Sequence, residues 1–201
     1  MPFGLQWYYW LILLAAVLLT IFAWSKALKA SKARRERLKK EAAIWKRDYE
    51  LREKFKVLTE DKIKETEEME LLHGVAMNIQ IMLENEVDMT SAFNALPHEK
   101  KIIYALEYFD EDAKKSLSTF FRSNGEPLTP IVPEALEAIG CEKYCQIIAP
   151  LMSMFDPDSD VSVDNTVIAR ADEEFASAYN SDELCRLSAR FIIKNKDIFL
   201  S

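Results

Sequence analysis

Apolar and polar residues divide the chain into one short apolar segment and a longer series of amphipathic segments. Residues 1–25 carry no charged side chain, and residues 5–24 read LQWYYWLILLAAVLLTIFAW. A helix of that length extends about 30 Å, which matches the hydrocarbon core of a bilayer. Trp and Tyr near its two ends are typical of the headgroup region. The pattern predicts a retained transmembrane helix at residues 5–24, because a signal peptide would need basic residues before a shorter apolar core.

The next segment, residues 25–58, lacks Pro and Gly and is rich in Ala, Lys, Arg, Glu and Leu. It therefore predicts a helical stalk that continues the membrane helix. Part of the stalk has the residue spacing of a coiled coil, at Leu38, Ala42, Trp45 and Tyr49. That spacing ends within two heptads, so it does not by itself predict a stable dimer.

The charge of the stalk predicts an orientation. Residues 26–56 contain thirteen Lys and Arg against five Asp and Glu, and basic flanks remain on the cytoplasmic side of a membrane. We therefore expect a single-pass protein of the inner (cytoplasmic) membrane, with residues 1–4 extracytoplasmic and the C-terminal part in the cytoplasm. The basic side chains could also bind anionic lipid, or they could serve only to set the topology.

Residues 59–201 contain apolar positions that recur three and four residues apart, as they do on the buried face of a helix. Only the Val-Ser-Val of residues 161–163 suggests a strand. The pattern predicts an all-α protein whose C-terminal part is one compact multi-helix domain. Its helices are expected to begin near Thr59, Pro97, Asp110, Pro133, Cys141, Ala169 and Ser181.

This domain has the opposite charge to the stalk. Residues 57–201 contain twenty-eight Asp and Glu against thirteen Lys and Arg. Such a surface repels nucleic acid and anionic lipid and attracts basic proteins. We expect a protein partner and no direct binding of nucleic acid.

No residues stand at a recognisable catalytic or cofactor-binding spacing. His73 and His98 lack a neighbouring nucleophile or acid in such a pattern and are interpreted as surface or capping residues. Cys141, Cys145 and Cys185 are an odd number in a chain predicted to be cytosolic, so free, packed thiols are expected rather than disulfides. The interpretation is a protein that is not an enzyme and needs no cofactor.

One acidic segment resembles a calcium-binding loop in part. Asp156, Asp158 and Asp160 stand at positions 1, 3 and 5 of an EF-hand loop, but Val161 replaces the required glycine and Val167 the bidentate glutamate. A solvated acidic loop is the favoured interpretation, and a weak cation site at the three aspartates is the alternative.

Four segments in a fixed order carry a resemblance: IIYALEYF, STFFRSNGE, PEALEAIGCEKYCQII and LCRLSARFIIKNKDIF. Over residues 91–201 the chain resembles the bacterial DNA-mimic-protein-like family, catalogued mostly as a domain of unknown function. Many members carry Asn-Gly-Gly-Phe where this chain has Lys114 to Leu117. The positions that carry the resemblance are Phe120, Phe121, Asn124, Gly125, Pro133, Ala135, Leu136, Ile139, Gly140, Asn195 and Phe199.

The resemblance implies a compact, helical, acidic domain without established catalytic residues. Together with the charge pattern, it favours a non-enzymatic, membrane-anchored cytosolic interaction domain whose acidic surface binds a partner, including a basic protein in the manner of a DNA mimic. The alternative is a ligand-binding or enzymatic domain with a pocket near Phe120, Asn124 and Tyr144. The sequence leaves open the identity of the partner, the biological process and the oligomeric state, because function depends on the site rather than on the fold.

Overall fold

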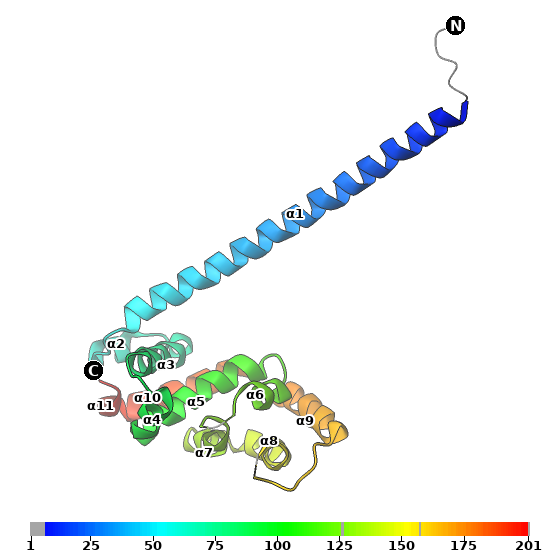
Figure 1. Ribbon diagram of the computed structural model, residues 1–201. Helices are drawn as coiled ribbons and strands as arrows, with labels where there is room; N and C mark the ends of the chain where they lie inside the picture. The colour runs from blue at the N-terminus through cyan, green and yellow to red at the C-terminus, as the bar shows by residue number, and fades with distance from the viewer. Residues whose placement is uncertain (1–6, 126, 157, 201) are drawn as a thin grey trace. The chain divides into compact units, whose positions relative to one another are not determined.

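The computed structural model describes residues 7–125, 127–156 and 158–200. Within these ranges the chain is helical and contains no strand, so the predicted all-α class is confirmed and the strand suggested at residues 161–163 is absent. Figure 1 shows the helices α1 (Trp7–Phe55), α2 (Glu60–Glu65), α3 (Glu68–Glu84), α4 (Met89–Ala95), α5 (His98–Ala113), α6 (Leu117–Ser123), the 3-10 helix η1 (Thr129–Ile131), α7 (Val132–Ala138), α8 (Glu142–Phe155), α9 (Asn165–Ala178), α10 (Ser181–Lys194) and α11 (Lys196–Phe199).

The chain divides into two units, Met1–Glu50 and Leu51–Ser201. The first unit consists of the greater part of α1, in which the described side chains of Leu38, Trp45 and Tyr49 are exposed. The second unit, which we call the helical domain, contains the last turn of α1 and all the other helices.

The predicted membrane anchor is wrong. Within the part of the chain that the structure describes, no helix is long and apolar enough to cross a membrane. Residues 7–24 of the expected span form the first turns of α1, and a bilayer requires about 20 consecutive apolar residues. Residues 5 and 6 of that span lie outside the described residues. The single-pass topology, the inner-membrane location and the membrane partner all depended on this anchor, and they are corrected with it.

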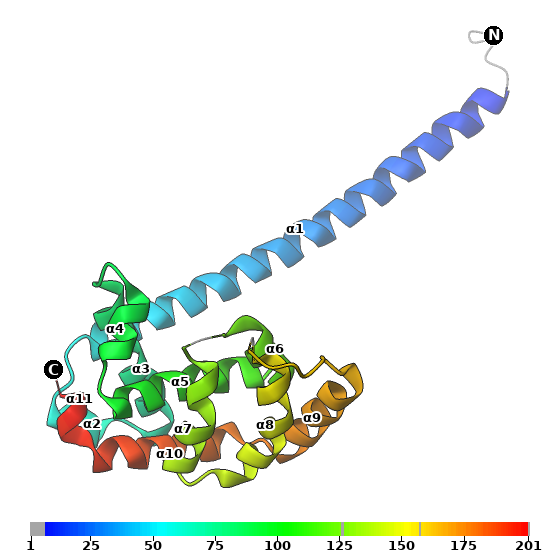
Figure 2. The same ribbon diagram turned by 60° about the horizontal axis from the view of Figure 1, so that its bottom comes forward.

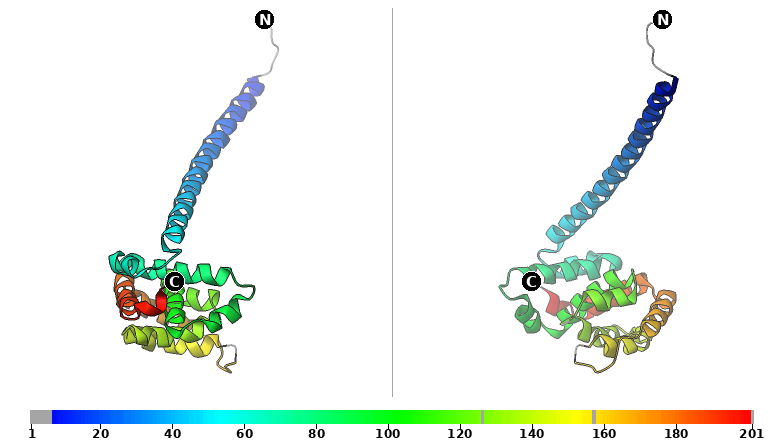
Figure 3. Two further views of the ribbon diagram at one scale, coloured as in Figure 1. Left: turned by 90° about the vertical axis from the view of Figure 1, so that its left-hand side faces the viewer. Right: turned by 45° about the vertical axis from the view of Figure 1, so that its right-hand side comes forward.

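The core of the helical domain is built around α5. This helix packs against α3, α6, α7 and α10, and α3 also lies along α10, as the views in Figures 2 and 3 show. Ile102, Ile103, Leu106 and Phe109 of α5 are buried because they recur on one helical face. Phe109 meets Phe120 of α6 and Phe175 of α9 edge to face. Aromatic pairs of this geometry join helices that are distant in the sequence.

Several helix boundaries differ from the predicted ones. The sequence predicts a new helix at Asp110, but α5 continues to Ala113, because Asp110 is buried and caps nothing; Ser116 caps α6 instead. The sequence predicts Ser181 as the cap of the last long helix, but Asn180 caps α10, because its side chain accepts the N–H of Glu183 at 3.2 Å. Similarly, Asp164 caps α9 at Asn165, ahead of the expected start near Ala169.

The segment from α6 to α8 contains the proline-rich positions of the family resemblance. The carbonyl of Gly125 accepts hydrogen bonds from two backbone N–H groups, which forms the turn after α6. Pro133 lies in the first turn of α7, where a missing N–H costs nothing. Gly140 ends α7 with a φ of 79°, a conformation that residues with a Cβ rarely adopt. The predicted helix start and the predicted glycine end are both confirmed.

Candidate functional site

The loop between α8 and α9 carries four aspartates among its described residues. Asp156, Asp158, Asp160 and Asp164 are exposed, and none of them forms an ion pair with any described residue. Asp156 accepts the N–H of Asp158 at 2.9 Å, and Asp164 accepts the N–H of Thr166 at 2.8 Å. These contacts shape the loop but leave its charge uncompensated. We refer to residues 156–164 as the acidic loop.

The basic residues nearest to the acidic loop in the sequence do not neutralise it. Lys143, on α8, pairs with Glu183 of α10, and Arg170 lies within α9. Exposed carboxylates Glu173 and Glu174 extend the negative charge along α9. The acidic loop can therefore present several charges of one sign to a partner.

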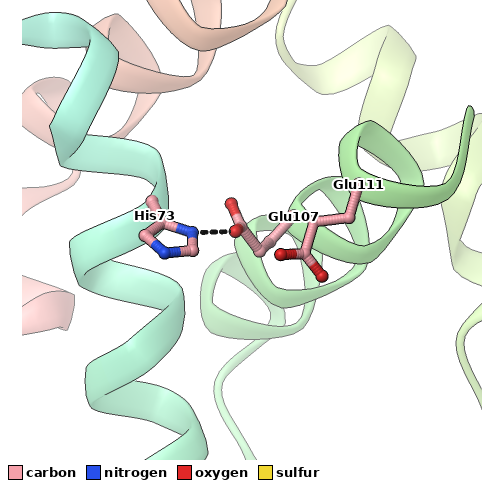
Figure 4. Close-up of side chains that lie close together, drawn as sticks. All are labelled: His73, Glu107 and Glu111. Atoms are coloured by element: carbon pink, nitrogen blue, oxygen red, sulfur yellow. Dashed lines mark hydrogen bonds and ion pairs between the residues drawn. The ribbon is translucent and has the colours of Figure 1, made fainter. Parts of the chain in front are cut away.

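A second candidate site lies between α3 and α5. His73 comes from α3, and Glu107 and Glu111 come from successive turns of α5 (Figure 4). One ligand atom of each residue lies within 4.8 Å of the other two. The Nδ1 atom of His73 is hydrogen-bonded to Oε1 of Glu107, and Glu107 is only 9% exposed. We call these three residues the His73 cluster.

The His73 cluster faces a pocket of about 240 Å³, which also has Arg52, Gln80, Glu84, Tyr104 and Tyr108 in its lining. Desolvation, and then the neighbouring charge of Glu107, raise the pKa of the Glu111 carboxyl group. A carboxylate close by disfavours the ionised form of Glu111. The pocket is thus a place where negative charge is crowded.

The far side of this pocket is held by hydrogen bonds. The hydroxyl groups of Tyr104 and Tyr108 both donate to Oε1 of Gln80, at 2.9 and 2.8 Å. Arg52 pairs with Glu84, and that hydrogen bond lowers the pKa of the Glu84 carboxyl. The charge of Arg52 is therefore balanced at the rim.

The sequence did not reveal the His73 cluster. His73 was predicted to be a surface or capping residue, and neither Glu107 nor Glu111 was predicted to be a site residue. The spacing of four residues between Glu107 and Glu111 does place both on one face of a helix, but the histidine stands 34 residues before Glu107. The other histidine matches its prediction, because His98 has a side chain that is 54% exposed and lies 3.2 Å from Glu134.

Phe120, Asn124 and Tyr144, the residues named for the alternative ligand pocket, make mainly structural contacts, and a pocket near them stays a prediction. Phe120 and Tyr144 are fully buried in the core. Asn124 donates to Asp112 at 2.8 Å and to the carbonyl of Phe120 at 3.1 Å, which closes the end of α6. These contacts organise the fold around the end of α6.

The three cysteines are free thiols, as predicted, with Cys141 and Cys185 buried and Cys145 half-buried. Burial raises the pKa of Cys141 and of Cys185 to about 11. Both thiols are therefore protonated at neutral pH and are poor nucleophiles.

The remaining positions of the family resemblance are mostly structural. Ala135, Leu136, Ile139 and Phe199 are buried, and Asn195 closes α10 by donating to the carbonyl of Phe191 at 2.9 Å. Asp156, Asp158 and Asp160 lie on the exposed acidic loop, and a cation site at these aspartates stays a prediction.

Comparison with known proteins identifies the family from the sequence. Searches of curated proteins and of solved structures give no match. The family model described as "DMP19-like protein" matches residues 94–199, which is more than half of the chain. This range begins just before α5, the central helix of the domain, and ends at the last residue of α11. The chain belongs to the DMP19-like protein family, a family of DNA-mimic proteins.

Proposed function

We propose that the helical domain is a non-enzymatic protein-interaction domain that binds a basic, DNA-binding protein through the acidic loop, as a DNA mimic does. The observation that carries the proposal is the row of four exposed aspartates at residues 156–164, none of which is paired with a base among the described residues. Membership in the DMP19-like family supports the same role.

The physical reason is the similarity of the two charge patterns. A DNA duplex presents one negative charge for about every 1.7 Å of its axis, and DNA-binding proteins meet these charges with Lys and Arg. Exposed carboxylates on a short loop can occupy the same basic side chains and so compete with DNA. Their charge also accelerates the encounter with a basic partner at low ionic strength.

Displacement from DNA tests the proposal. The full-length protein is titrated into helix-turn-helix regulators, each bound to its own fluorescent operator duplex, and anisotropy reports release. We expect release of at least one regulator at low salt and a weaker effect as salt rises, because exposed charges are screened. A titration of the protein into duplex alone shows whether it binds DNA directly, which the proposal excludes.

Two variants that each remove three negative charges identify the surface that binds the regulator. Replacement of Asp156, Asp158 and Asp160 by Asn should abolish release. The control variant, Glu65, Glu67 and Glu68 to Gln, removes the same number of exposed carboxylates near the start of α3 and should retain release. Equal loss in both variants would show that net charge acts without the acidic loop, and failure to release any regulator at every salt concentration would refute the DNA-mimic role.

A further inference from the structure

We propose that the His73 cluster binds one divalent transition-metal ion, with Zn²⁺ as the ion that fits its ligands best. The site is independent of the acidic loop, and its occupancy does not depend on the proposed partner. His73, Glu107 and Glu111 would supply three protein ligands, and water from the pocket would complete the coordination.

The geometry is close to that of a bound site. Zn²⁺ forms bonds of about 2.0–2.2 Å to His nitrogen and carboxylate oxygen, so ligand atoms around a tetrahedral ion lie about 3.4 Å apart. The ligand atoms of the cluster lie within 4.8 Å of one another. Glu111 is exposed, so rotation about its side-chain bonds can bring its carboxylate closer to the other two ligands. Figure 4 shows both glutamates on the side of α5 that faces His73.

The chemistry of the ligands selects the ion. Imidazole nitrogen favours Zn²⁺ and other transition metals, whereas Ca²⁺ and Mg²⁺ prefer sites made entirely of oxygen. Two carboxylates offset the charge of a divalent ion, and such an ion relieves the repulsion between two acids that stand one helical turn apart. Within this cluster, Glu107 is hydrogen-bonded to His73.

The surroundings leave room for an ion with water ligands. The pocket measures about 240 Å³, and the exposed Glu111 lies in its lining. The nearest cationic side chain in its lining, Arg52, is paired with Glu84 and so opposes a bound cation less than a lone arginine would.

Metal binding would link two parts of the chain. His73 lies before the matched family range of residues 94–199, and both glutamates lie within it. An ion at the cluster would therefore join α3 to the central helix of the family domain. Because an ion that binds only the folded state stabilises it, occupancy should raise the melting temperature.

The test is metal titration of the full-length, chelator-treated protein, followed by calorimetry and by the melting temperature. We expect one Zn²⁺ per chain and a higher melting temperature, with a weaker effect of Mn²⁺ and none of Mg²⁺ or Ca²⁺ at equal concentration. Co²⁺ used as a probe should give a spectrum without thiolate charge-transfer bands, since the ligands are nitrogen and oxygen. Thiolate bands would assign the ion to the cysteines and overturn the proposal.

Matched variants identify the ligands. Glu111→Gln and His73→Gln should each weaken Zn²⁺ binding about tenfold or more. The control is His98→Gln, which removes the other histidine and its contact with Glu134, and it should bind Zn²⁺ as the unmodified protein does. Because Glu111 is exposed, its variant is expected to fold even if His73→Gln does not. Absence of Zn²⁺ binding, or equal binding by Glu111→Gln and His98→Gln, would refute the site.

Discussion

Gly74 shows how one residue is determined by a neighbour distant in the sequence. It lies inside α3, where glycine is normally unfavourable, and a Cβ at this position would stand 2.3 Å from Cζ of Phe55. Phe55 is fully buried at the end of α1. The glycine therefore lets the aromatic ring lie directly against the backbone of α3.

Replacing Gly74 by Ala should lower the free energy of unfolding by up to about 2 kcal/mol. The gain in helix propensity is about 1 kcal/mol, but forcing a methyl group into a filled core costs about 1–3 kcal/mol. Urea unfolding measures the difference. Gly125→Ala serves as the control, because a Cβ there meets nothing within 4 Å. A Gly74→Ala protein as stable as the unmodified one would show that the ring of Phe55 can move aside.

Asp110 is a buried charge with three partners. It is 4% exposed, accepts hydrogen bonds from the hydroxyl groups of Tyr179 and Ser181, and pairs with Lys114. Burial, and then the hydrogen bond to Asp110, raise the pKa of Tyr179, which keeps that hydroxyl protonated as a donor. The carboxylate thereby holds the turn between α9 and α10 against α5.

The Asp110→Ala variant should lose about 2–4 kcal/mol of stability, since both hydroxyl groups lose a charged acceptor inside the protein. Asp110→Asn retains one acceptor oxygen and should lose less. Denaturant midpoints of the two variants, compared with Tyr179→Phe in a double-mutant cycle, give the strength of the contact. If the effects of Asp110→Asn and Tyr179→Phe on stability were additive, the two side chains would not interact, which would contradict a stabilising hydrogen bond between them.

At the scale of elements, an ion pair joins α2 to α11. These are the first and the last helix that lie entirely within the helical domain. Glu60 of α2 pairs with Lys196 at the start of α11 and also with Lys64. The hydrogen bond from Lys196 is the largest cause that lowers the pKa of Glu60 from 4.5 to about 2, and the bond from Lys64 follows. Because the folded state holds the carboxylate ionised, the contact stabilises the fold above pH 4.5.

The stabilisation by the Glu60 ion pairs should disappear as the pH falls from 4.5 to about 2, because Glu60 then becomes protonated in the folded state as well. Lys196→Met should therefore be slightly less stable than the unmodified protein at pH 7, and the difference should shrink across that range. The pair is exposed, so the effect is small and should weaken with salt. Melting temperatures as a function of pH measure it. Lys194→Met is the control, because Lys194 forms no ion pair within the described residues. A pH-independent difference would exclude Glu60 as its source.

Element boundaries were predictable where the signal is local. Thr59 caps α2 as expected, through a 3.3 Å bond to the N–H of Lys62, and Gly140 ends α7. The sequence missed α4, which Asp88 caps by accepting two backbone N–H groups, and it joined α2 and α3 into one helix. Short helices carry too few turns to show a clear apolar period, and tertiary packing stabilises them instead.

At the scale of the whole molecule, charge was readable from the sequence but its arrangement was not. Composition alone shows that the C-terminal part is acidic, whatever its fold. Which carboxylates remain unpaired depends on neighbours: Glu183 meets Lys143 across two helices, whereas the aspartates of the acidic loop meet no base in the described part of the chain. The N-terminal segment was predicted wrongly. Its apolar run predicted a membrane helix, but the described residues contain no helix that is long and apolar enough to cross a membrane.

The sequence by itself determined the all-α class, the family, the proline start and glycine end of α7, and the acidic character of the helical domain. These properties depend on neighbouring residues or on summed composition. Only the tertiary structure decided which residues meet: His73 with Glu107, 34 positions apart, and Asp110 with Ser181, 71 positions apart. Helix packing brings such pairs together by burying apolar faces elsewhere on the same helices, so no local pattern around either residue records the contact.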